Sequence, residues 1–103
     1  MKKLFISQPM ADKTDKEILA ARNRAIRIAK ELLDDEIEVI NSFIESAPED
    51  AKPLWYLGES LKFLSEADVA YFVEDWENYR GCRIEYICAQ EYGIDIIKDG
   101  IED

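Results

Sequence analysis

One glutamate has surroundings that suit covalent chemistry. Glu85 falls in a helical segment, and its neighbours three and four residues away are all small and uncharged: Gly81, Cys82, Cys88 and Ala89. Such a face packs closely on a sheet and leaves a slot above the carboxylate. There, burial raises the pKa of Glu85 while the helix N-terminus lowers it. A carboxylate that is ionised but poorly solvated can act as a nucleophile. The alternative is a first-turn glutamate that only stabilises the helix dipole.

The chain contains no histidine, which excludes Ser-His-Asp and Cys-His catalysis and most zinc sites. Acid–base or nucleophilic chemistry must then use carboxylates, tyrosines, lysines or thiols. We expect no metal and no cofactor. Cys82 and Cys88 lie about 240° apart around a helix and cannot pair within it. We interpret them as small core residues whose reduced thiols fit a cytoplasmic protein.

The hydrophobic pattern predicts the scaffold that positions these residues. Thr14 and Glu17 have the capping-box spacing that begins a long amphipathic helix, and Pro53 suits the start of a second. The core-facing stripe of that second helix is expected at Leu54, Leu57, Leu61 and Leu64. A third helix is expected from Gly81 to Tyr92, with Gly93 as its C-cap.

Four short apolar runs between these helices indicate buried strands. The predicted strands are Lys3–Ile6, Ile37–Ile40, Val69–Val73 and Ile94–Ile97. Because strands alternate with helices and parallel crossovers are right-handed, we expect an α/β fold. Its form would be a three-layer Rossmann/flavodoxin-like sandwich with a four-stranded parallel sheet in the order 2-1-3-4. Asp68, at the amino end of the third strand, is interpreted as a turn or cap residue.

Ligands of such sheets bind outside the carboxyl ends of the strands. The segments that meet there supply the candidate ligand-binding residues, of which Trp76 and Tyr79 are expected to stack on a base. The candidates are Ser7, Gln8, Met10, Asn41, Asp75, Trp76, Asn78, Tyr79 and Gly81. Loops at a sheet end are polar in any case, so a purely structural interpretation of them stays open.

The length of 103 residues and a composition that is 48% hydrophobic and 35% charged fit one globular domain covering residues 1–103. The net charge of −10 argues against nucleic-acid and membrane partners, because both require a basic surface. The apolar run after Met1 ends at Ser7, too early for a signal peptide.

Three segments resemble the nucleoside 2-deoxyribosyltransferase superfamily, and most closely its small, functionally unassigned bacterial and phage-borne branch. They are residues 4–10 (LFISQPM), 66–72 (EADVAYF) and 81–89 (GCRIEYICA). The resemblance implies cleavage of the N-glycosidic bond of 2′-deoxynucleosides or their 5′-monophosphates. Glu85 matches the glutamate that forms a covalent deoxyribosyl intermediate, and Gly81 matches the glycine before it. The sugar then passes to another base or to water.

The chain also departs from the family pattern. Gln8 replaces a frequent glycine, and Met10 stands where nucleotide-cleaving relatives have an arginine that serves the phosphate. Ser60 occupies the position of an acid, and Tyr79 that of a polar substrate contact. Asp75 or Glu77 are the residues that could take the place of the missing acid.

The resemblance therefore implies a nucleoside- or nucleotide-binding protein that cleaves or transfers an N-glycosidic bond. A non-catalytic nucleotide-sensing or interaction module of the same fold is the alternative, and a purely structural oligomer subunit is a third. Relatives form dimers or larger rings, and Trp55, Tyr56 and Phe63 supply much aromatic surface. We expect a homo-oligomer, most simply a dimer.

Overall fold

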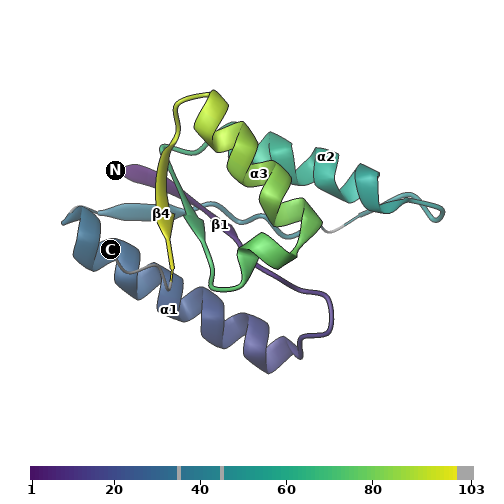
Figure 1. Cartoon of the computed structure of the whole chain (residues 1–103), viewed down its shortest axis with the longest axis horizontal. Coiled ribbons are helices and arrows are strands. Elements are labelled where there is room, and N and C mark those ends of the chain that lie inside the picture. The colour runs from purple at the N-terminus through teal and green to yellow at the C-terminus, as the bar shows by residue number, and fades with distance from the viewer. Residues whose placement is uncertain (35, 45, 100–103) are drawn as a thin grey trace.

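Four short strands pair in parallel and carry helices on both faces, as the computed structural model shows for residues 1–34, 36–44 and 46–99 (Figure 1). The strands are β1 (Lys2–Ser7), β2 (Ile37–Val39), β3 (Val69–Phe72) and β4 (Asp95–Lys98). The helices are α1 (Asp15–Leu33), α2 (Pro53–Leu64) and α3 (Arg80–Glu91), with a short 3-10 turn, η1 (Trp76–Asn78), before α3. The strand order is β2-β1-β3-β4, which confirms the predicted α/β sandwich.

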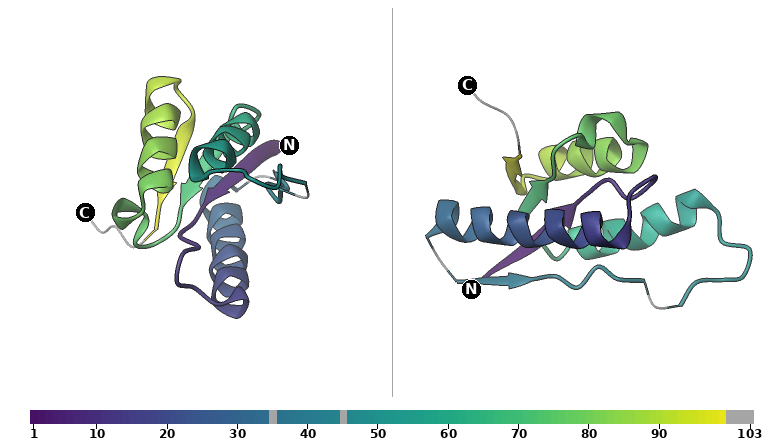
Figure 2. Two further views of the ribbon diagram at one scale, coloured as in Figure 1. Left: turned by 90° about the vertical axis from the view of Figure 1, so that its right-hand side faces the viewer. Right: turned by 90° about the horizontal axis from the view of Figure 1, so that it is seen from below.

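Alternation along the strands divides the core into two layers. Leu4 and Ile6 of β1 point toward α1 and pack against the small residues Ala25 and Ala29. Phe5, between them, points to the opposite face, where α2 and α3 lie (Figure 2). Because side chains of a strand alternate with period 2, Ser7 shares the face of Phe5. This register aims the last side chain of β1 at α2 and α3.

The predicted elements are all present, and the ends that the sequence predicts lie within one residue of the observed ones. The predicted helix stripe is confirmed at Leu61 and Leu64, which belong to the core, but Leu57 lines a cavity and Leu54 is 74% exposed. Leu54 lies in the first turn of α2, where it borders a cavity instead of the core. Phe63 packs against the core cluster on that side of the sheet.

Side-chain caps secure the ends of several elements. The Asp68 carboxylate accepts a hydrogen bond from the backbone N–H of Lys3 at 2.8 Å, which confirms it as a cap residue beside the start of β1. The C-cap of α3 is Tyr92 and not Gly93 as predicted. Gly93 follows it with a φ of +70°, where glycine is favoured because it has no Cβ. No helix in the part of the chain described here combines the length and apolarity needed to cross a bilayer.

The capping box of α1 offers a test of the fold. The Thr14 hydroxyl accepts from the Glu17 N–H, and the Glu17 carboxylate accepts from the Thr14 N–H. Thr14→Ala should lower the free energy of unfolding by about 1 kcal/mol because the cap is lost. Urea denaturation measures the change, and Thr14→Ser, which keeps the hydroxyl, is the control. Equal stability of wild type and Thr14→Ala would contradict the role of the cap.

Candidate active site

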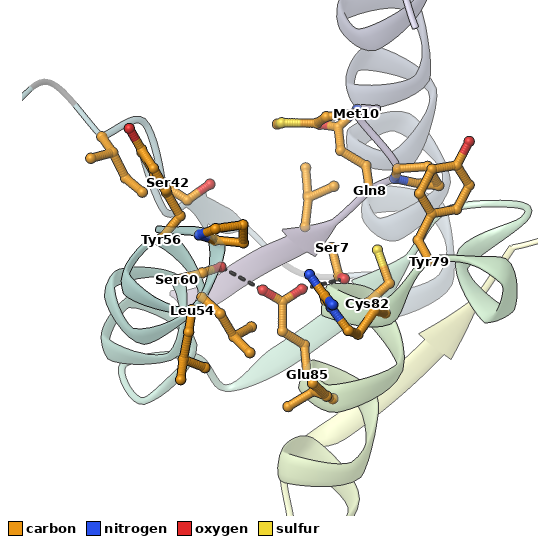
Figure 3. Close-up of a pocket in the computed structure, with 18 of the residues that line it drawn as sticks. Ser7, Gln8, Met10, Ser42, Leu54, Tyr56, Ser60, Tyr79, Cys82 and Glu85 are labelled. Atoms are coloured by element: carbon orange, nitrogen blue, oxygen red, sulfur yellow. Dashed lines mark hydrogen bonds between the residues drawn. The ribbon is translucent and has the colours of Figure 1, made fainter. Parts of the chain in front are cut away.

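The carboxylate of Glu85 lies at the meeting point of α3, β1 and α2. Its Oε1 accepts a hydrogen bond from the Ser7 hydroxyl at 2.6 Å, and its Oε2 accepts one from the Ser60 hydroxyl at 2.5 Å (Figure 3). The whole residue is only 7% exposed. Two serines thus hold both oxygens of a buried carboxylate, which fixes its position and orientation.

Each of the three side chains owes its place to local sequence. Ser7 ends β1 on the α2/α3 face, and Pro9 follows shortly after as a strand breaker. Ser60 lies on α2 one residue before Leu61, which packs against the core. Glu85 lies on the buried face of α3 together with Cys82 and Ala89. The buried face of each element therefore carries one polar group to a common point.

Burial has the largest effect on the pKa values of Glu85 and Cys82. It raises the pKa of Glu85 above the ordinary glutamate value, while hydrogen bonds from Ser60 and Ser7 act in the opposite direction. Burial also raises the pKa of the Cys82 thiol to about 11, the charge of Glu85 adds to this, and a hydrogen bond with Ser7 opposes it. At neutral pH Cys82 is therefore a protonated thiol, which makes it a poor nucleophile.

A cavity of about 850 Å³ opens beside the Glu85 carboxylate. Its charged residues are Glu85, Lys52 and Arg80, and much of the rest of the wall is apolar or aromatic. The lining residues are Ile6, Ser7, Gln8, Pro9, Met10, Ser42, Ile44, Lys52, Pro53, Leu54, Tyr56, Leu57, Ser60, Tyr79, Arg80, Gly81, Cys82, Ile84 and Glu85. An organic molecule of nucleotide size fits such a space, since ligand pockets usually measure about 300–1,000 Å³.

Gly81 contributes open space to this cavity. A Cβ placed on Gly81 would meet no atom within 4 Å, so the glycine does not serve close packing on the sheet. This corrects the expectation that the small face of the helix closes on the sheet at this point. Cys82 and Ala89, on the same helix, are buried as expected.

Of the predicted site residues, one group comes together around the cavity. Ser7, Gln8, Met10, Tyr79, Gly81 and Glu85 all line it. The Gln8 amide also donates to the Ile18 carbonyl at 3.0 Å, which anchors the loop after β1 to α1. The Tyr79 hydroxyl donates to the Ala11 carbonyl at 3.4 Å. Tyr79 is therefore the predicted stacking residue that the fold brings to the cavity.

The other predicted residues lie elsewhere, and Trp76 needs the clearest correction. Its ring is 8% exposed and stacks on Tyr86, with centroids 4.5 Å apart and planes inclined at 21°. The ring also contacts Phe72 in the core. The apolar layer beneath α3 draws this large ring inward, because burying an aromatic side chain removes much apolar surface from water. Trp76 does not line the cavity.

Asp75, Asn78 and Asn41 are also absent from the cavity wall. Asn78 donates its side-chain amide to the Asp75 carboxylate, and Asp75 has a left-handed φ of 77° at the start of η1. The Asn41 side chain accepts from the Phe43 N–H at 3.2 Å. Each of these polar groups stabilises its own turn, the usual use of Asp and Asn in loops.

The candidate list missed several lining residues, among them Ser60, Lys52, Arg80 and Cys82. Ser60 carried a signal: a hydroxyl beside the core stripe of a helix needs a partner when it is buried. Lys52 and Arg80 each stand at the N-terminal end of a helix whose first turn borders the strand ends. Their positions depend on how α2 and α3 are packed, which periodicity does not reveal.

A second, smaller cavity of about 400 Å³ lies where α1 meets the ends of the strands. Asp75 lines it, together with Arg24, which pairs with Asp99 at 3.1 Å and Glu74 at 4.0 Å. Burial and the charge of Asp99 raise the pKa of the nearby Tyr71 to about 12. In the residues described, no cluster of His, Cys, Asp and Glu suited to a metal ion is found.

The raised pKa of Glu85 makes stability depend on pH. The folded protein binds a proton at Glu85 more tightly than the unfolded chain does. The stability gained from this protonation is therefore fully present below the ordinary pKa of 4.5, and it is lost as pH rises through the raised pKa of the folded state. Glu85→Gln resembles the protonated form. We therefore expect wild type to lose stability relative to Glu85→Gln as pH rises above the ordinary value of 4.5.

Urea denaturation across this pH range tests the expectation. The matched control is Glu91→Gln, on an exposed position of the same helix, which should show the same pH dependence of stability as wild type. A difference between wild type and Glu85→Gln that stays constant with pH would contradict the buried-carboxylate interpretation.

No family model, curated protein or solved structure matches the chain. The likeness to the nucleoside 2-deoxyribosyltransferase superfamily thus stays a prediction made from three sequence segments. Independent of it, the described residues provide a buried carboxylate held by Ser7 and Ser60 beside a cavity of about 850 Å³.

Proposed function

We propose that the cavity binds a nucleoside or nucleotide and that Glu85 attacks the anomeric carbon of its sugar. The observation that carries the proposal is the buried Glu85 carboxylate, held through both oxygens and facing a cavity of about 850 Å³. The resemblance of residues 81–89 to the nucleophile segment of the nucleoside 2-deoxyribosyltransferases supports the same assignment. The reaction class is cleavage or transfer of an N-glycosidic bond.

The chemistry requires an ionised carboxylate aligned with a carbon atom. An Oε of Glu85 would form a bond to C1′ as the bond from C1′ to the base nitrogen breaks, which leaves a glycosyl ester. Attack by water or by a second base on C1′ then releases Glu85. Hydrogen bonds from Ser7 and Ser60 hold the carboxylate during the first step and keep it from rotating away.

The cavity walls suit the other parts of a nucleotide. Tyr56, Tyr79 and Leu54 offer apolar and aromatic surface for a base. Lys52 and Arg80 bring positive charge to the cavity of a chain whose net charge is −10. Two cations in an acidic protein favour an anionic group such as a 5′-phosphate, and they compensate for Met10 at the position of the family's phosphate-binding arginine.

The main test is Glu85→Gln. The variant nearly preserves side-chain volume and hydrogen-bonding reach but removes the charge that attacks carbon. We expect cleavage of deoxynucleosides or their monophosphates, measured with and without a second base, to fall at least about 100-fold. Binding, measured by thermal shift, should persist.

Glu91→Gln, on the exposed end of α3, is the control and should keep wild-type activity. A Glu85→Gln protein that retains most of its activity would remove Glu85 from the mechanism. Binding without any cleavage by wild type would favour the nucleotide-sensing module instead. Absence of any ligand-induced shift would leave only the structural role.

The assembly state and the compartment belong to the same proposal. Cys82 and Cys88 are free thiols, and we propose that the protein works in the cytoplasm, where thiols stay reduced. Leu54 is 74% and Tyr56 44% exposed, and both border the cavity. Exposed apolar side chains that gather in this way favour a protein contact. A homodimer that covers them would also shield the cavity from water.

We therefore expect light scattering at micromolar concentration to give twice the chain mass of 11.9 kDa. Leu54→Glu should shift the mass toward the monomer, because it introduces a charge into the contact. The control is Leu32→Glu, at an exposed leucine on α1 on the opposite face of the sheet. A monomeric wild-type protein would contradict the proposed dimer.

A further inference from the structure

The cavity offers few groups that could donate a proton to a departing base. Among the described residues that line it, Glu85 is the only carboxyl group. The two acids considered as substitutes are not there: Asp75 lines the second cavity and accepts from Asn78, and Glu77 lines neither cavity. The chain has no histidine to serve instead.

The other protic groups of the wall are poor acids. The hydroxyl protons of Ser7 and Ser60 are already donated to Glu85. Burial raises the pKa of the Cys82 thiol to about 11, which keeps its proton in place at neutral pH. Phenols, ammonium groups and guanidinium groups as classes hold their protons up to about pH 10 or above. Each of these groups is a weaker acid than a carboxylic acid.

Glycoside hydrolases normally use two carboxyl groups, one to attack or stabilise the sugar and one to protonate the leaving group. A neutral base that leaves from an N-glycoside likewise needs a proton. A single carboxyl group cannot attack C1′ and donate a proton in the same step. A leaving group that is already cationic at the glycosidic nitrogen needs no proton, because it departs as a neutral ring. The described cavity supplies one carboxyl group that can attack C1′, and the cleavage of such a cationic substrate requires no second one.

We propose that the preferred substrates are N-glycosides in which the base is a cationic heteroaromatic ring, such as pyridinium nucleosides and nucleotides. This inference rests on the proposed function of Glu85 as nucleophile. An Oε of Glu85 forms a bond to C1′, and the electron pair of the C1′–N bond moves to the ring nitrogen, which leaves as neutral pyridine. Water then attacks C1′, Glu85 is released as a carboxylate, and one proton passes to solvent.

The charges in the cavity fit this substrate class. The Glu85 carboxylate attracts a cationic ring and the positive charge that develops on the sugar. The aromatic faces of Tyr56 and Tyr79 can hold a flat cation by cation–π contact. Lys52 and Arg80 can hold a phosphate at the other end of the same molecule. A pyridinium mononucleotide carries this combination of positive ring and negative phosphate.

Matched substrate pairs test the proposal. Nicotinamide mononucleotide and its reduced form differ in ring charge, as do 7-methylguanosine and guanosine. We expect the wild-type protein to cleave the cationic member of each pair at least about 100-fold faster than the neutral member. The neutral base needs general acid catalysis, which contributes about 10²–10⁴-fold to the rate and which this cavity lacks a second carboxyl group to provide. The rate on nicotinamide mononucleotide, whose ring charge does not change with pH, should rise as Glu85 ionises and then stay level, without a falling limb at high pH.

The outcomes separate this inference from the proposed function. Equal rates within each pair, or a bell-shaped pH profile on nicotinamide mononucleotide, would overturn the cationic preference. If that activity is still lost in Glu85→Gln, the nucleophile assignment survives. Cleavage of the cationic members that persists in Glu85→Gln, or no cleavage of any substrate, overturns both.

Installing an acid provides a second, independent test. Ser60 Oγ lies 2.5 Å from Glu85 Oε2, so Ser60→Asp would place a second carboxyl group beside the first. Two carboxyls at this distance share a proton, and one becomes an acid at neutral pH. We expect Ser60→Asp to raise cleavage of neutral nucleosides at least about 10-fold relative to Ser60→Asn. The Asn variant matches its size without an acidic proton, and equal activity of the two would count against the inference.

Discussion

The two hydrogen bonds that the Glu85 carboxylate accepts from Ser7 and Ser60 constrain much of this molecule. A buried carboxylate is costly unless its oxygens have donors, and here the donors come from two other elements. β1 must therefore end with Ser7 on the α2/α3 face, and α2 must pass close enough to α3 for Ser60 to reach Glu85. The carboxylate thus couples the packing of three elements to one point at the carboxyl ends of the strands.

This arrangement lowers the stability of the folded protein and in return keeps the Glu85 carboxylate reactive. Burial raises the pKa of Glu85, so the ionised form costs folding free energy that a glutamine would not. Gly81 leaves open space beside the carboxylate, and Leu54 stays exposed at the cavity edge. None of these features improves the core. All of them keep a poorly solvated, oriented oxygen within reach of a ligand, as strained or unfavourable local choices at functional sites commonly do.

Charge within the cavity is distributed differently from charge on the chain as a whole. The chain carries a net charge of −10, yet Lys52 and Arg80 line the cavity together with Glu85. A ligand there meets one buried negative group and two positive ones within the same space. Such a mixture selects molecules that carry both signs, and a substrate is then oriented by its own charges as well as by the shape of the walls.

Much of the fold could be predicted from the sequence because it depends on patterns of neighbouring residues. The Thr14 capping box, Pro53 at a helix start and the apolar strands all act over a few residues, so each predicted element is present within one residue of its expected ends. The strand order followed from the right-handed crossover rule. Glu85 was also recognisable, since its small neighbours lie on the same helix.

Tertiary structure alone decided which side chains share the cavity with Glu85. Trp76 and Tyr79 stand three residues apart in one polar segment, yet Trp76 packs under α3 on Tyr86 while Tyr79 borders the cavity. In the sequence, Ser60 stands at the position where the family pattern has an acid. Only the approach of α2 to α3 shows that its hydroxyl binds the Glu85 carboxylate. Periodicity reports which face of an element is buried. It does not report the distance or angle between two elements, and these set which polar groups meet.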